Sequence, residues 1–226
     1  MQLTIQIISY CRLNARADRI FRGAPMSFLV SGYYHRYLSH RSWSCPRWLE
    51  VIMCICSAGF ALTPAISWVS MHRKHHRYAD QTQDPHGPKR SLWHNLTLSL
   101  YNYELKYAGK LLLKDNLYAF QLKYYWWCIG LAMGIFALTA GIEFWLMIVG
   151  WVFLFQIALN LLGHQQGGTV NSHLGSIVLA GELYHRQHHD NPNLARFGLL
   201  DWPYHGVIRW LGACGKNVSE PAPSPH

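Results

Sequence analysis

The residues best suited to chemistry in this chain are its histidines, because they are numerous and clustered. The sequence holds 14 histidines in 226 residues. At that frequency the pattern His-x-x-His-His is expected about 0.05 times by chance. It occurs twice, at His72–His76 and at His185–His189. Clustered histidine is typical of metal binding, so we interpret the repeated pattern as a set of metal ligands.

The spacing within each pattern predicts three imidazoles on one face of a helix. Residues i, i+3 and i+4 share a helical face, and two such helices facing each other are able to chelate two metal ions. The two sets are His72, His75 and His76, and His185, His188 and His189.

Two shorter patterns add candidate ligands. His35 and His40 are five residues apart, which is not one face of a regular α-helix. We expect them at a helix end, or bound to different metals. Asn160 and His164 are four apart at the end of an apolar segment. They are expected to point to the place where the other clusters gather.

The residue types narrow the choice of metal without deciding it. Imidazole suits Zn, Cu, Fe and Ni. Nine histidines shared by two ions give four or five ligands each, whereas structural zinc takes four ligands and usually includes cysteine. The six cysteines show no paired zinc-ribbon spacing. Four or five nitrogens with open positions fit iron that must bind oxygen.

The elements that position these histidines are predicted to be membrane helices. Charged residues make up 14% of the chain, against about 25% in soluble domains. The segment Tyr124–Gly163 has one charge, Glu143, and as a helix it is about twice as long as a ~30 Å hydrocarbon core. We therefore predict a helical hairpin with its turn at 141–143. All lysines and arginines lie outside 124–185, which places the flanks of the hairpin in the cytoplasm.

A second charge-free run, Val51–Met71, is predicted to be interfacial or re-entrant. A simple crossing would place His40 and His72 on opposite faces of the bilayer, and Pro64 interrupts the run. Buried irregular backbone is tolerated at membrane depth. The segment Asn95–Lys123 alternates at helical spacing and predicts one or two amphipathic cytoplasmic helices.

Together these motifs resemble the histidine boxes of the membrane fatty acid desaturases, of the acyl-CoA (stearoyl-CoA delta-9) type. The matching stretches are HRYLSHR, HRKHHRYAD followed by QDPH, NLLGH, and GELYHRQHH followed by DNP, in the family's order. The resemblance runs from Gly32 to Leu211. It implies an all-α, multi-pass membrane protein with a cytoplasmic, histidine-rich di-iron cap. Residues 1–218 would form a single desaturase domain, and 219–226 a disordered tail.

The resemblance also implies the ligands, the cofactor and the reaction. Two iron ions would be bound, with Asn160 holding a water on one of them. The reaction would be O2-dependent insertion of a double bond into the fatty acyl chain of an acyl-CoA or acyl-lipid. Electrons would come from a separate cytochrome b5-like or ferredoxin partner, and no nucleic acid is expected. The implied histidine ligands are His35, His40, His72, His75, His76, His164, His185, His188 and His189.

Two other functions share these motifs. One is a related di-iron lipid or alkane hydroxylase or acetylenase, and the other is a non-catalytic metal-binding membrane remnant. The chain also departs from the family's usual pattern. Only 34 residues precede His35, so the N-terminal hairpin is shortened, and the segment from His164 to His185 is short as well.

Several residues near the histidine motifs have two possible roles. Metal-bound imidazoles need an acceptor on their other nitrogen, so nearby carboxylates are either such acceptors or solvated charges. His86 either orients a neighbouring box or is a turn residue. The carboxylates are Asp80, Asp84, Glu182 and Asp190, and the histidines read as non-ligands are His94, His173, His205 and His226.

Overall fold

The structure is a computed structural model that describes residues 25–60, 62–86, 90–91, 93–94, 103–165 and 168–211. Over these residues the regular structure is helical apart from one two-stranded hairpin, and turns and loops join the elements, in agreement with the all-α prediction. The predicted shortened N-terminal hairpin and the tail 219–226 lie outside the described residues. The elements are η1 (Leu29–Ser39), α2 (Arg47–Gly59), α3 (Ala65–Tyr78), η3 (Leu105–Tyr107), α4 (Lys110–Lys114), α5 (Asn116–Thr139), α6 (Ile142–Leu162), β1 (His164–Gln165), β2 (Gly168–Thr169), α7 (His173–Val178), α8 (His185–Asp190), η4 (Tyr204–Ile208) and α9 (Arg209–Leu211).

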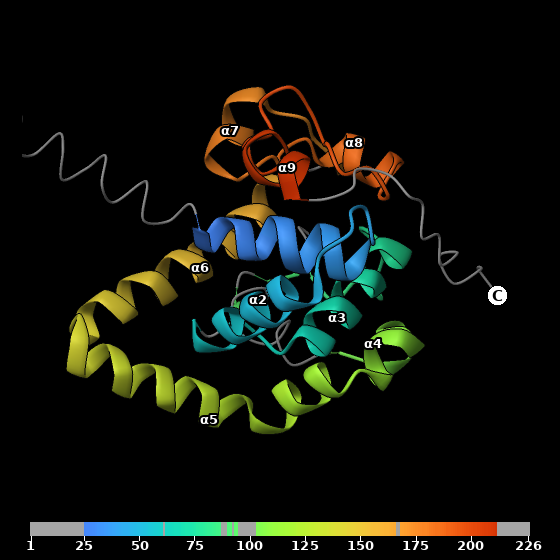
Figure 1. Ribbon diagram of the computed structural model, residues 1–226. Coiled ribbons are helices and arrows are strands. Elements are labelled where there is room, and N and C mark those ends of the chain that lie inside the picture. The colour runs from blue at the N-terminus through green and yellow to red at the C-terminus, as the bar shows by residue number, and fades with distance from the viewer. Residues whose placement is uncertain are drawn as a thin grey trace, which may run out of the picture.

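Figure 1 shows η1 at the centre of the arrangement, between α2 and α3 on one side and the C-terminal cap of α7 to α9 on the other. Helix α5 packs against α2, and α6 returns from the end of α5 to the cap. Because η1 is enclosed from both sides, all its residues are buried. Side chains of η1 therefore meet side chains of the cap and of α3 in the interior.

Helix η1 is a π-helix, and this explains the five-residue spacing of its histidines. The backbone N–H of His40 donates to the carbonyl of His35 at 3.3 Å. The i→i+5 bond of a π-helix brings residues five apart to the same side. His35 lies inside η1, and His40 is the residue at which the helix ends. The prediction of a helix end is confirmed for His40.

The charge-free run around 51–71 is divided between α2, which ends at Gly59, and α3, which begins at Ala65. Gln121 of α5 supplies hydrogen bonds at this break. Its Oε1 accepts from the backbone N–H of Ala65 at 2.8 Å, and its Nε2 donates to the carbonyl of Cys54 at 3.1 Å. The first backbone N–H of α3 and a carbonyl inside α2 are thus satisfied by one side chain of α5. The interfacial or re-entrant placement of this run stays a prediction.

Helices α5 and α6 form the predicted hairpin, joined at Ala140 and Gly141. Gly141 has φ +89°, and a Cβ there would lie 2.7 Å from Oε2 of Glu143. Glycine is therefore the residue that the turn requires.

Of the helices in the described part of the chain, α6 is the one long and apolar enough to cross a membrane. Helix α5 is kinked at Tyr124, and the run Tyr124-Tyr125-Trp126-Trp127 lowers the hydropathy of its first half. The described residues therefore contain one candidate membrane span.

Candidate metal centre

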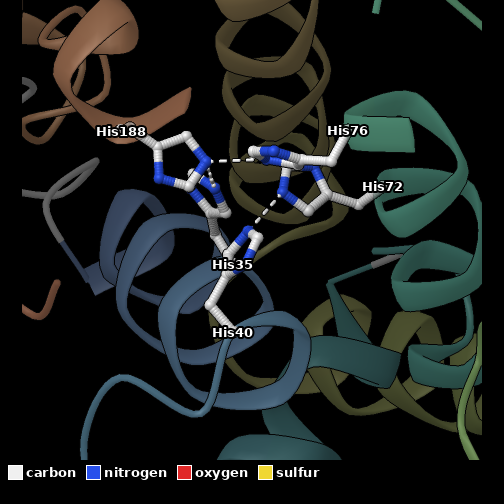
Figure 2. A group of neighbouring side chains, drawn as sticks. All are labelled: His35, His40, His72, His76 and His188. Atoms are coloured by element: carbon white, nitrogen blue, oxygen red, sulfur yellow. Dashed lines mark hydrogen bonds between the residues drawn. The ribbon is translucent and has the colours of Figure 1, made fainter. Parts of the chain in front are cut away.

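The histidines predicted to bind metal lie in two groups in the interior of the protein. In each group the potential ligand atoms all lie within 4.8 Å of one another. Figure 2 shows the first group, with rings from η1, α3 and α8 converging on one point. The first group is His35, His40, His72, His76 and His188, and the second is His75, His164, His185 and His189.

The Nε2 atoms of the first group face one another at short distances. His188 Nε2 lies 2.8 Å from Nε2 of both His35 and His76, and His40 Nε2 lies 2.8 Å from His72 Nε2. For metal–nitrogen distances of about 2.0–2.1 Å, neighbouring ligands are about 2.9 Å apart at right angles and about 3.4 Å apart in a tetrahedron. Five imidazoles in one group are also more than the four ligands of a tetrahedral ion.

The second group has the same form. His164 Nε2 lies 3.0 Å from His75 Nε2 and 2.8 Å from His185 Nε2, and His189 Nε2 lies 3.1 Å from His185 Nε2. Every imidazole in both groups thus directs the same ring nitrogen inward. The donor set and its geometry fit two metal ions.

Each His-x-x-His-His helix supplies both groups. Helix α3 gives His72 and His76 to the first group and His75 to the second, while α8 gives His188 to the first. The i+3 and i+4 residues flank the direction of residue i, so neighbouring side chains diverge toward adjacent ions. The two groups are therefore side by side.

The short segment after α6 is sufficient to position α8. The β1–β2 hairpin, in which His164 pairs with Thr169, turns the chain back. The side-chain oxygen of Asn171 then accepts from the backbone N–H groups of Arg186 at 3.1 Å and Gln187 at 3.3 Å. These bonds satisfy free N–H groups at the start of α8.

Carboxylates hold the outer nitrogens of three imidazoles. Glu182 Oε2 lies 2.6 Å from His35 Nδ1, and Asp84 Oδ1 lies 2.9 Å from His75 Nδ1. Asp80 Oδ2 accepts from His164 Nδ1 at 3.3 Å. The hydrogen bonds of Asp84 and Asp80 fix the orientation and tautomer of His75 and His164. The contact of Glu182 with His35 is an ion-pair distance without hydrogen-bond geometry, and it places a negative charge beside that ring. The fourth candidate, Asp190, is exposed, so we interpret it as a solvated surface charge.

Burial favours the neutral form that binds metal in eight of the nine imidazoles, because it lowers their pKa. It lowers the pKa of His189 to about 3 and that of His164 below its ordinary value. Burial also lowers the pKa of a larger set well below the ordinary value, with neighbouring imidazoles adding to the effect. This set is His40, His72, His75, His76, His185 and His188.

His86 is buried, and its ring stacks on that of His75, with centroids 4.3 Å apart and planes at 20°. Burial lowers the pKa of His86 to about 3. Together with His75 and Asp84 it forms a third set of possible metal ligands. Its packing against His75 agrees with a role in orienting that ring.

The other named residues lie apart from the two groups or at their edge. Asn160 is partly buried on α6, one turn before His164, and its role in holding a water stays a prediction. His94 Nε2 lies 2.9 Å from a backbone carbonyl, and His173 Nδ1 lies 2.8 Å from a tyrosine hydroxyl. His205 belongs to neither group. His226 is outside the described residues.

Sequence reasoning missed residues that surround the histidines. Arg36 and Asp201 are fully buried and paired at 2.8 Å. The ring of Phe197 lies 4.7 Å from that of His188, and Trp68 stacks on His72 at 4.9 Å. Arg36 directly follows a predicted ligand, but no sequence pattern indicates its partner.

Two adjacent groups of buried imidazoles inside a helical fold define a class: histidine-rich helical proteins able to hold two metal ions. Comparison with known proteins identifies the family within that class. A sequence model of the fatty acid desaturase family matches residues 21–204. The chain therefore belongs to the fatty acid desaturase family.

Individual relatives agree with this assignment. Delta-9 acyl-lipid desaturase 2 of Arabidopsis thaliana is 32% identical over 75% of this chain and 61% of its own length. Palmitoyl-monogalactosyldiacylglycerol delta-7 desaturase of the same plant is 30% identical over 97% of this chain and 66% of its own length. An acyl-CoA 5-desaturase of Anemone leveillei is 29% identical over 75% of this chain and 59% of its own length. The chain thus spans about three fifths of the length of the first of these relatives.

Proposed function

We propose that this protein is an O2-dependent oxidoreductase that introduces a double bond into a fatty acyl chain at a histidine-ligated di-iron centre. The observation that carries this proposal is the convergence of the histidine Nε2 atoms into groups of five and four, in a chain of the fatty acid desaturase family. Two iron ions bound there would supply the O2 chemistry needed to remove hydrogens from unactivated CH2 groups.

The residues of this chain contribute ligands, orientation and a dry environment. Both imidazole groups are mostly buried, so water is excluded and polar contacts are strengthened. Asp84 and Asp80 accept hydrogen bonds from Nδ1 of His75 and His164, and Glu182 lies 2.6 Å from Nδ1 of His35, so each Nε2 is free to face a metal. Phe197 covers the outer side of His188. These contacts preorganise the site before substrate binds.

The substrate class follows from the relatives, whose names place the acyl chain on a lipid, a galactolipid or CoA. We propose an acyl-CoA or acyl-lipid substrate for this chain. Its electrons would come from a separate cytochrome b5-like or ferredoxin protein.

We further propose that α5 and α6 both cross the membrane, with the histidine groups on the cytoplasmic side. The outward faces of the two helices are apolar: Leu138 is 89% exposed, Leu131 68% and Leu154 64%. The turn at Gly141 carries no lysine or arginine, while both flanks of the hairpin are basic. The positive-inside rule then places the flanks in the cytoplasm.

The test is expression in a desaturase-deficient host, followed by fatty-acid profiling. We expect new monounsaturated acyl chains, and none when the host carries His188→Ala at the same protein level. Hydroxylated or acetylenic products would instead assign the chain to a related di-iron enzyme. An unchanged profile with metal-loaded protein would favour a non-catalytic metal-binding remnant.

A further inference from the structure

A buried ion pair connects the first histidine motif to the segment that follows the last one. Arg36 on η1 is fully buried beside His35. Its Nη1 donates to Asp201 Oδ1 at 2.8 Å and to the carbonyl of Ala195 at 3.3 Å. Its Nη2 donates to the carbonyl of Ala180 at 3.2 Å. A buried guanidinium persists only when paired and hydrogen-bonded in this way.

Asp201 organises the segment around it. Its Oδ2 accepts from the backbone N–H of Phe197 at 2.7 Å, and its Oδ1 accepts from that of Tyr204 at 3.2 Å. The guanidinium carbon of Arg36 lies 3.9 Å from the centre of the Phe197 ring. The same ring packs 4.7 Å from that of His188. Arg36 therefore holds the aromatic ring that covers one ligand of the five-histidine group.

The guanidinium also packs against the turn that carries Glu182. Ala180 and Gly181 both have positive φ, +51° and +82°. A Cβ on Gly181 would lie 2.7 Å from Nη2 of Arg36. The turn ends at Glu182, which is fully buried, accepts from Ser31 Oγ, and lies 2.6 Å from Nδ1 of His35. The position of Arg36 thus determines where this carboxylate meets a second ligand.

The ion pairs of Arg36 leave a negative charge that faces the histidines. One guanidinium lies between two buried carboxylates, with Glu182 Oε1 3.9 Å and Asp201 Oδ1 2.8 Å from Arg36. Arg36 lies closer to Asp201 than to Glu182. The guanidinium therefore compensates mainly the charge of Asp201, and the charge of Glu182 faces His35. A carboxylate on Nδ1–H makes the opposite ring nitrogen a stronger metal donor.

We propose that Arg36 is a positioning residue for the five-histidine group. It sets Glu182 against His35 and Phe197 against His188, and so acts mainly on the metal affinity and ligand field of that group. The same turn reaches the four-histidine group through the backbone carbonyl of Glu182, which lies 3.3 Å from His185 Nδ1. The proposal deepens the proposed function and rests on the part of it that assigns a metal ion to these histidines.

The experiment is titration of the purified full-length protein with Co2+ alone, read by affinity and by the visible absorption of the bound ion. The native protein is expected to bind two ions. In Arg36→Gln one of the two should bind about 10–100-fold more weakly with a shifted absorption spectrum, while the other should be affected much less. Arg36→Lys keeps the charge and loses the planar fork, so its weakening should be intermediate.

Arg47→Gln is the matched control. Arg47 also pairs with two carboxylates, Glu50 at 2.8 Å and Asp115 at 2.7 Å, but its side chain is 54% exposed and lies on α2. Both Co2+ affinities and the spectrum should be those of the native protein in this variant, even if it unfolds at a lower temperature.

Asp201→Asn is the second variant, and it decides the question if Arg36→Gln does not fold. Native affinity and spectrum in a folded Arg36→Gln or Asp201→Asn protein would show that the ion pair is merely structural, and would overturn the proposal. Failure of the native protein to bind two Co2+ ions would overturn the di-iron function itself. The two failures are therefore distinguishable.

Discussion

Asp84 gives a prediction whose size follows from its three hydrogen bonds. The carboxylate is buried, and Oδ1 accepts from His75 Nδ1 at 2.9 Å and from the backbone N–H of His86 at 3.1 Å. Oδ2 accepts from the backbone N–H of Asp80 at 2.8 Å. All three partners are donors. An asparagine must therefore turn its NH2 group toward at least one N–H, whichever way it is oriented.

Asp84→Asn is thus expected to have two effects. The unsatisfied buried N–H should lower the free energy of unfolding by about 1–3 kcal/mol. The loss of the negative charge behind His75 should weaken metal binding at the four-histidine group about 10–100-fold, or about 1.4–2.7 kcal/mol. The five-histidine group should bind as before, because its members make no contact with Asp84 that the structure shows among the described residues.

The assay is Co2+ titration together with thermal unfolding of the metal-free and loaded protein. Asp190→Asn is the control, because Asp190 is exposed and its substitution should change neither measurement. Equal Co2+ affinity in Asp84→Asn and native protein would refute the reasoning that this carboxylate supports a ligand.

The remaining predictions concern a ligand, a close contact and the membrane topology. His188→Ala should abolish double-bond formation in host lipids while protein level stays near native, because His188 Nε2 lies 2.8 Å from two other ligands; near-native activity would remove it from the site. Gly163→Ala should lower metal occupancy of the four-histidine group, since a Cβ there would lie 3.0 Å from the His185 ring and 2.7 Å from a carbonyl; unchanged occupancy would show that the ring can move aside. A cysteine placed at Gly141 should be labelled from outside the cell and one placed at Lys216 only after permeabilisation, and the reverse pattern would contradict the topology.

Much of the site was predictable because helical spacing fixes where side chains point. The two His-x-x-His-His patterns lie on helices α3 and α8. What spacing could not show is that each helix serves both groups, since that depends on the angle at which α3 and α8 meet. The spacing of His35 and His40 did not indicate a shared face for a different reason. Residues five apart do not share a face of an α-helix, whereas the chain forms a π-helix here.

The elements that support the site were harder to foresee. The sequence indicated the hairpin turn at Gly141 by an interruption of the apolar segment, and it indicated the break between α2 and α3 by Pro64. The pair of Arg36 with Asp201 joins residues 165 positions apart, and such a contact leaves no local pattern. A buried charge finds its partner through the tertiary fold, so single-sequence reasoning has nothing from which to infer it.

The most direct test of the central claim is the metal content of the purified protein. Protein expressed with iron and isolated without oxygen should contain two iron ions per chain, measured by elemental analysis against amino-acid quantification. His188→Ala should retain at most one firmly bound ion. Two zinc ions, or no metal in folded native protein that also fails to take up Fe2+, would contradict the claim that the two histidine groups form a di-iron centre.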